Sequence, residues 1–247
     1  MKIKYAIVSS DQNEMYLDFW NPIMKVWSQH IKIKPILVLI SDKNNVVDYG
    51  DYIIHEIKKI EDIDTGLQSQ ISRMYVTKFY NDDICITSDI DMIPLGFNYF
   101  NNIVNDFDDN SLIILSSDAY KNENRYPLCY NVGKGETFNE IMDFNVTFDE
   151  YVNRILTFNW GWDSDELYFG LKVNEFNDNS RIKKLNRGWT NGIAHKRIDR
   201  CLWYYNEKFI KDDFYIDCHS LRPYKNYKNE IDKLINIILK QDVINEI

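Results

Sequence analysis

The sequence lacks two features that would point to a membrane or nucleic-acid function. No apolar run approaches the roughly 18 residues of a transmembrane helix, so we expect no transmembrane segment. Acidic residues outnumber basic ones, with 38 Asp and Glu against 29 Lys and Arg, and the formal net charge is −9. Because a general nucleic-acid-binding protein needs a basic face, we do not expect nucleic acid as a partner.

Cysteine is scarce. The four cysteines, Cys85, Cys129, Cys201 and Cys218, include no Cys-x-x-Cys pair and neither require nor exclude disulfides. A reducing compartment is the simpler interpretation. Residues 1–8 are too short and too alternating for a signal peptide, so we expect a cytoplasmic protein.

Glycine-rich phosphate-binding loops are missing as well. Residues 9–13, which follow the first predicted strand, contain neither glycine nor lysine, and Gly133-Lys134-Gly135 lacks the spacing of a Walker loop. No internal repeat, linker or low-complexity tract divides the 247 residues. We therefore expect a single domain over residues 1–247.

Strand and helix patterns alternate through the first half of the chain. The apolar spacing predicts helices over 14–30, with a break near Asn21, and over 67–80 and 97–107. Shorter helices are expected over 137–144 and 229–240. Strands are predicted over 4–9, 36–40, 52–57, 84–88 and 112–115. This order predicts an α/β fold with a mostly parallel sheet flanked by helices.

Four predicted strands run into clusters of serine and aspartate. These clusters are Ser9-Ser10-Asp11, Ser41-Asp42, Ser88-Asp89-Ile90-Asp91 and Ser116-Ser117-Asp118. Helix capping would explain one or two of them. Because open α/β sheets bind ligands beyond the carboxyl ends of their strands, four such clusters favour a polar cleft along that edge.

The Asp89-Ile90-Asp91 pair is the most informative of these clusters. Apolar residues surround it, and burying two carboxylates is costly unless a cation or hydrogen-bond donors compensate. We expect the strand to end in a turn at 92–94. Carboxylate oxygens suit Mg²⁺ or Mn²⁺, so the pair is a candidate metal site that would in turn hold a phosphate.

Together with this pair, three further segments indicate a family. They are Gln68 to Arg73 before the Asp pair, Trp160 to Leu167 with its acidic cluster, and His195 near the end. With the N-terminal βαβ pattern, the order of these segments resembles that of nucleotide-sugar-dependent glycosyltransferases of the GT-A fold, especially small viral and bacterial members. The resemblance spans about residues 2–203.

The resemblance implies a Rossmann-like central sheet with two functional halves. Residues 1–95 would bind the nucleotide, 96–220 the acceptor, and 221–247 would form a C-terminal helix. The metal would be held by Asp89, Asp91 and His195, with Asp91 coordinating directly and Asp89 facing the ribose or a metal-bound water. For a viral member, the location would be the cytoplasm of the host.

The donor implied is a nucleoside diphosphate sugar, with UDP favoured over GDP. The residues expected on its side are Ser9, Asp11, Asp42, Gln68, Arg73, Asp89 and Lys196. For Asp11 and Asp42, helix capping is the alternative. Arg73 and Lys196 would otherwise be exposed surface charges.

The acidic cluster is expected to act on the acceptor, a hydroxyl of a glycan or small molecule. We favour Asp165 as the base of an inverting transfer, with Asp163 and Glu166 as alternatives. Asp163 would otherwise cap the helix that follows. Trp160, Trp162 and Trp189 would stack on an acceptor sugar or lie in the core.

Two other functions remain open at this point. A metal-dependent nucleotidyltransferase also uses paired carboxylates, but it would normally have a glycine-rich basic loop after the first strand. A non-catalytic carbohydrate-binding module would explain the aromatic residues, 15% of the chain, but not the buried Asp pair.

Overall fold

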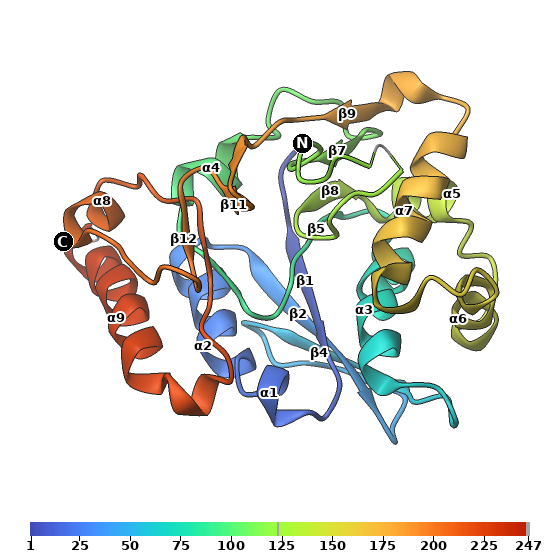
Figure 1. Cartoon of the computed structure of the whole chain (residues 1–247), viewed down its shortest axis with the longest axis horizontal. Coiled ribbons are helices and arrows are strands. Elements are labelled where there is room, and N and C mark those ends of the chain that lie inside the picture. Colours follow the sequence, from blue (N-terminus) through green and yellow to red (C-terminus); the bar gives the residue numbers. More distant parts are fainter. Residues whose placement is uncertain (123, 246–247) are drawn as a thin grey trace.

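The computed structural model describes residues 1–122 and 124–245, and within them the largest sheet has eight strands in the order β3-β4-β2-β1-β5-β8-β7-β9 (Figure 1). The strands are β1 (Tyr5–Ser10), β2 (Lys34–Ser41), β3 (Asn45–Asp48), β4 (Ile53–Lys58), β5 (Ile84–Thr87), β7 (Leu112–Ile114), β8 (Asn131–Lys134) and β9 (Ile182–Lys184). The parallel pairs are β4-β2, β2-β1, β1-β5 and β7-β9, whereas β3 and β8 run antiparallel to their neighbours. The predicted mostly parallel α/β sheet is confirmed.

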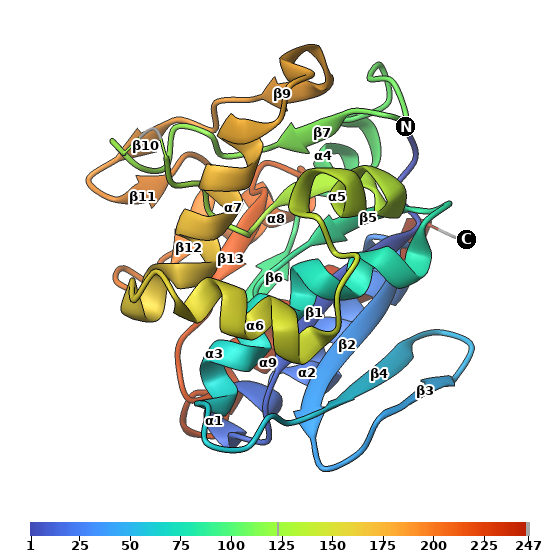
Figure 2. The same cartoon turned by 90° about the vertical axis from the view of Figure 1, so that its right-hand side faces the viewer.

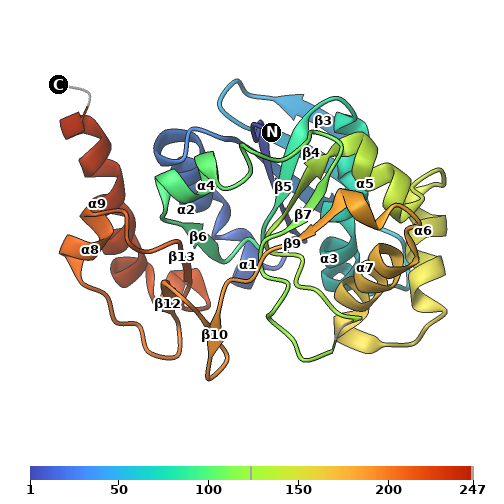
Figure 3. The same ribbon diagram turned by 90° about the horizontal axis from the view of Figure 1, so that it is seen from above.

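Helices cover both faces of this sheet (Figures 2 and 3). On one face lie α3 (Thr65–Tyr75), α5 (Gly135–Met142), α6 (Phe148–Leu156) and α7 (Ser164–Glu175). On the other lie α2 (Trp20–Lys25), α4 (Phe97–Asn102), α8 (Glu207–Lys211) and α9 (Lys228–Asn245), while the short α1 (Glu14–Leu17) follows β1. No helix in the described part of the chain is long and apolar enough to cross a membrane.

Strand β1 shows why two helical layers are needed. Ala6 and Val8 point into one core cluster, together with Trp27 and Leu234, while Ile7 points into the other, with Ile71. All three strand residues are fully buried. Successive side chains of a strand face opposite sides, so a continuous apolar run requires cover on both.

A second, smaller sheet follows the Asp pair directly. It contains β12 (Arg197–Asp199), β13 (Asp217–His219) and β6 (Met92–Pro94), in that order. The expected turn at 92–94 is therefore wrong, because these residues pair antiparallel with β13, His219 opposite Met92. This pairing brings the end of β13 beside Asp91.

A buried ion cluster holds the second sheet. The Asp217 side chain is fully buried and accepts two hydrogen bonds from Arg187 at 2.8 Å and two from Arg197 at 2.9 Å. Arg187 follows β9 of the main sheet, and its backbone N–H donates to Asp118. Arg197 lies in β12. The cluster therefore ties β13 to its neighbour and to the edge of the main sheet.

Several predicted boundaries differ from the observed ones. The predicted helix over 14–30 is divided into α1, α2 and a π-helical turn at Val26–His30, and the helix predicted over 97–107 ends at Asn102. Strands β3 and β8 were not predicted. The expected C-terminal helix corresponds to α9, and its last two positions, 246–247, lie outside the described residues. The assignment of the nucleotide and acceptor halves stays a prediction.

Candidate active site

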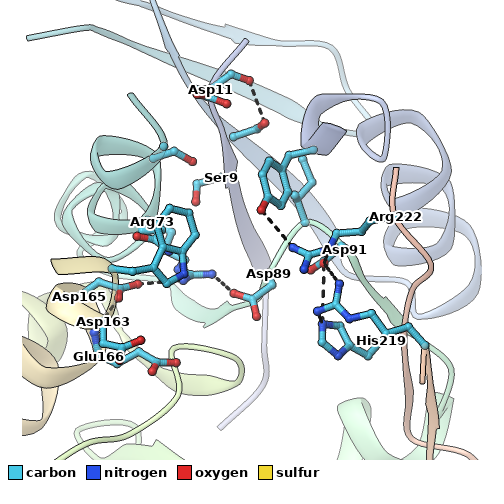
Figure 4. Close-up of a pocket in the computed structure, with 18 of the residues that line it drawn as sticks. Ser9, Asp11, Arg73, Asp89, Asp91, Asp163, Asp165, Glu166, His219 and Arg222 are labelled. Carbon is cyan, nitrogen blue, oxygen red and sulfur yellow. Dashed lines mark hydrogen bonds and ion pairs between the residues drawn. The ribbon is translucent and has the colours of Figure 1, made fainter. Parts of the chain in front are cut away.

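A cavity of about 340 Å³ opens at the carboxyl ends of β1 and β5 (Figure 4). Its walls come from the end of β1, from α3, from the segment between β5 and β6, from the acidic segment before and within α7, and from the ends of β12 and β13. Of the four serine and aspartate clusters, those at Ser9 to Asp11 and at Asp89 to Asp91 line it. Asp42 and Asp118 do not: Asp42 pairs with Lys59, and Asp118 accepts from two backbone N–H groups.

Asp91 lies on one wall among three potential cations. Its side chain is 7% exposed, and its Oδ2 lies 3.2 Å from Arg200 Nη1, 3.5 Å from Arg222 Nε and 3.8 Å from His219 Nε2. Figure 4 shows Arg222 and His219 on the side of Asp91 away from Arg73. The two arginines compensate the negative charge of this buried carboxylate.

His219 has a second acidic neighbour behind it. Its Nδ1 lies 3.5 Å from Asp199 Oδ2, and its Nε2 also contacts Arg200. Burial lowers the pKa of His219, although Asp91 opposes that shift. The lowered pKa favours the neutral imidazole, and the contacts with Asp199 and Arg200 fix its orientation.

Arg73 bridges the cavity from α3. It donates to Asp89 and, through Nη2 at 3.1 Å, to Asp165 Oδ2 on the opposite wall. Burial disfavours the charge of Arg73, but the two carboxylates outweigh it and raise its pKa. Burial raises the pKa of Asp165, and Arg73 partly offsets that effect. Arg73 lines the cavity as a buried link between its two walls, so the alternative of an exposed surface charge is wrong.

The other acidic residues share a second arginine. Arg125, from the loop before β8, donates to both Asp163 oxygens at 2.8 Å and to Glu166 Oε2 at 2.7 Å. Tyr120 donates to Glu166 Oε1 at 3.0 Å. Burial, followed by the nearby Asp165 carboxylate, raises the pKa of Glu166 to about 7. Asp163 does not cap α7 through its side chain.

Three predicted residues lie elsewhere. His195 is exposed and does not line the cavity, and its backbone N–H donates to Gly188. Gln68 is fully buried and bonds the backbone of Ile60 and Ile63, so it fixes the chain before α3. Lys196 lies over the ring of Phe214.

Sequence reasoning missed the cationic and imidazole groups of the cavity. These are Arg125, Arg200, His219 and Arg222, with Tyr16 and Tyr120 as neighbours. The sequence contained one local signal for these groups. His219 and Arg222 stand three residues apart after a short apolar stretch, and Asp199 and Arg200 stand at the end of another such stretch. Only the pairing of β6, β12 and β13 shows that both ends meet the Asp pair.

The donor groups suit a divalent cation in part. Asp91 and His219 converge, but Asp89 is turned toward Arg73. Among the described residues, no three His, Cys, Asp or Glu side chains converge closely enough to hold a metal in this arrangement. A site for Mn²⁺ or Mg²⁺ would require Asp89 to turn away from Arg73, and Asp91 Oδ2 already lies 3.2 Å from Arg200 and 3.5 Å from Arg222.

Comparisons with known proteins define the fold class. No protein-family model and no curated protein sequence matches the chain. The sheet, its helical layers and the matching solved structures identify a GT-A-type fold.

One similar structure is the apo form of the glycosyltransferase GlyE from Streptococcus pneumoniae TIGR4, with 11% identity and a TM-score of 0.54. That match covers 99% of this chain and 64% of the GlyE chain, so this chain spans less than two thirds of GlyE. Another is the galactosyltransferase LgtC in complex with donor and acceptor sugar analogs, with 10% identity and a TM-score of 0.49, covering 93% of this chain and 95% of LgtC. At 11% identity, the likeness to GlyE shows the fold alone.

Proposed function

We propose that the protein is a glycosyltransferase that moves a sugar from a nucleoside diphosphate sugar, UDP favoured, to an acceptor hydroxyl. The observation that carries the proposal is the cavity itself, which places the Asp89 and Asp91 carboxylates opposite Asp165 and Glu166. The wall with Asp89 and Asp91 has the groups to bind a diphosphate and its counter-ion. The wall with Asp165 and Glu166 has acidic groups that could accept the proton of an acceptor hydroxyl. The GT-A-type fold supports the same function.

On the donor wall, Asp89, Asp91 and His219 are the proposed ligands of Mn²⁺ or Mg²⁺. His219 replaces His195 in this role because it lines the cavity beside Asp91 and has Asp199 behind it. When bound, the cation would supply positive charge that offsets the leaving nucleoside diphosphate. Arg200 and Arg222 add fixed positive charge on the same wall.

At the end of β1, Ser9 and Asp11 are proposed to contact the nucleoside. Asp11 is oriented by a hydrogen bond that its Oδ2 accepts from Thr65 at 2.7 Å. Its other oxygen accepts from the backbone N–H of Asn13, and Asn13 itself, not Asp11, caps α1. Asp42, Gln68 and Lys196 have no place in this proposal, since they lie outside the cavity.

On the acceptor wall, a carboxylate takes the proton of the attacking hydroxyl in an inverting transfer. Asp165 was favoured from the sequence, but the structure gives Glu166 the better-suited pKa, about 7, for proton transfer near neutrality. Asp165 instead orients Arg73, and Asp163 orients Arg125.

The test is the release of UDP or GDP from a panel of nucleotide sugars in the presence of Mn²⁺. We expect turnover with at least one donor, its loss in EDTA, and a decrease of roughly 100-fold or more in Asp91→Asn, because a ligand of the proposed cation is weakened. Circular dichroism and thermal unfolding would check that the variant is folded. Full activity of Asp91→Asn, or turnover in EDTA, would exclude the metal-dependent mechanism.

The same panel separates the alternatives. A nucleotidyltransferase would join a nucleoside triphosphate to a sugar phosphate with release of pyrophosphate, and would not release UDP. A carbohydrate-binding module would turn over none of these substrates. No observation on the cavity favours either function over glycosyl transfer.

A further inference from the structure

Trp162 is the exposed aromatic residue of the cavity. It lines the cavity and is 60% exposed. It lies in a single 3₁₀ turn, Gly161–Asp163, at the start of α7. Gly161 precedes it with a φ of +70°, a left-handed conformation that a residue with a Cβ adopts only with strain. The backbone is thus shaped to present this side chain at the mouth of the cavity.

The ring of Trp162 makes no contact with another aromatic ring or a cation among the described residues. The other five tryptophans each contact a ring or an arginine, in the pairs Trp20–Tyr52, Trp27–Phe100, Trp160–Phe158, Trp189–Arg197 and Trp203–Tyr205. Within residues 1–122 and 124–245, Trp162 alone among the six has no such ring or cation contact. Because Trp162 also lines the cavity, the exposed apolar area of its indole faces the space that a ligand would enter.

The surroundings of Trp162 belong to the acceptor wall. The next residue, Asp163, is fixed by Arg125, and Glu166 follows on the first turn of α7. On its other side, the ring borders the start of α3: a Cβ added to Gly66 would lie 3.9 Å from Trp162 Cζ3. Trp162 therefore stands where a molecule entering from solvent would meet the acidic segment.

We propose that Trp162 is a stacking platform for the ring of a saccharide acceptor. The inference rests on the proposed function and narrows its acceptor to a sugar. The C–H groups on one face of a pyranose ring form an apolar surface that matches an indole face, while its hydroxyl groups remain at the edge. Trp162 and Glu166, the proposed base, line the same cavity, so a saccharide on the indole would share that cavity with the base.

The donor is the less suitable occupant of this platform. Ser9, Asp11 and the wall with Asp91, Arg200 and Arg222 provide the polar and cationic groups that a nucleoside diphosphate needs. Trp162 lies in the acidic segment, beside carboxylates that would repel phosphate groups. A neutral saccharide has no such penalty.

The experiment compares Trp162→Leu with a matched control, Trp160→Leu. Trp160 has the same chemistry two residues earlier, but it stacks on Phe158 at 4.3 Å and does not line the cavity. Two rates are measured for each protein with the best donor: transfer to methyl glycosides, lactose, maltose or cellobiose, and hydrolysis, in which water is the acceptor.

We expect the ratio of transfer to hydrolysis to fall about tenfold in Trp162→Leu, through a higher KM for the saccharide, because one stacking contact is lost. Trp162→Phe should restore part of it, and Trp160→Leu should keep the wild-type ratio. An unchanged ratio of transfer to hydrolysis in Trp162→Leu would overturn the proposed platform. A loss of donor binding, measured with UDP, as large as the loss of saccharide binding would overturn it as well.

Failure of the proposed function would be visible separately. If no nucleotide sugar is turned over, the platform is tested by quenching of tryptophan fluorescence with the same saccharides. Quenching that is present in wild type and in Trp160→Leu, but absent in Trp162→Leu, supports a saccharide platform without transferase activity. No quenching by any of these saccharides would overturn the platform as well.

Discussion

Glu166 lies among groups that shift its pKa in opposite directions. Burial and the neighbouring Asp165 raise the pKa from 4.5, Arg125 lowers it, and the result is about 7. Asp165 is more deeply buried but bound to Arg73. The two adjacent carboxyl groups thus differ in the arginine that each contacts.

The pKa of Glu166 predicts the pH dependence of turnover. A base must be deprotonated, so kcat/KM should rise with pH through about 7 and level off above it. Glu166→Gln should lower turnover by about 100-fold or more and remove this rise. The measurement is the rate of UDP release over a pH series at saturating Mn²⁺. If Asp165→Asn removes the rise while Glu166→Gln keeps it, Asp165 is the base.

The two histidines 195 and 219 offer a matched comparison. His219 lines the cavity beside Asp91, whereas His195 is exposed outside it. We expect His219→Ala to weaken Mn²⁺ binding roughly 10- to 100-fold or more, as loss of a metal-site residue does, and His195→Ala to leave it unchanged. Isothermal titration with Mn²⁺ in the presence of UDP measures both. The reverse pattern would restore the assignment made from the sequence.

The histidine shows why part of the site was not predictable. The Asp pair follows an apolar strand, which is a local pattern, and so it was found. His219 becomes a neighbour of Asp91 only because β13 pairs with β6, a three-residue strand that carries no pattern of its own. The order of segments in the sequence identified two of the three proposed metal ligands, Asp89 and Asp91. The third, His219, could be identified only from its tertiary contact with Asp91.

At the level of elements, close approach of backbone brings Arg125 into the cavity. Gly170 lies in α7, and a Cβ there would be 2.0 Å from the carbonyl oxygen of Asn124 and 3.1 Å from the N of Arg125. Only glycine permits this contact. The loop before β8 therefore rests on α7. From this position Arg125 reaches Asp163 and Glu166, which lie one helical turn or more before Gly170 in the chain.

The Arg187–Asp217–Arg197 cluster predicts how the second sheet responds to mutation. Asp217→Asn leaves two buried guanidinium groups without their carboxylate, so the free energy of unfolding should fall by about 3–5 kcal/mol. Burial alone would raise the pKa of Asp217, but the two arginines hold it well below its usual range. The stability that the ionised Asp217 carboxylate contributes is therefore lost as the pH falls and the carboxylate is protonated. Urea unfolding measures the change.

A surface pair serves as the control for this cluster. Asp48 bonds Lys34 at 2.7 Å, but its side chain is 57% exposed. Asp48→Asn should leave the urea midpoint nearly unchanged, because solvent screens exposed ion pairs. An equally small effect of Asp217→Asn would show that the cluster does not hold the second sheet.

At the scale of the whole molecule, the central parallel strands of the main sheet were predictable, whereas β3 at one edge and β8 between β5 and β7 were not. Continuous apolar runs such as Ile36 to Ile40 require cover on both faces, and this is enough to predict parallel strands between two helical layers. Strand β3 has a weak apolar pattern and lies at an edge, and β8 contains Gly133 and Lys134. Such strands form because a neighbour offers backbone hydrogen bonds, which the local sequence does not encode.

The bridge made by Arg73 has a consequence for the order of events in the cavity. One guanidinium charge is shared between Asp89 on one wall and Asp165 on the other. A ligand that draws Asp89 away would leave that charge wholly to Asp165, so filling one wall alters the electrostatic environment of the other. The electrostatic environments of the two walls are therefore linked through this one side chain.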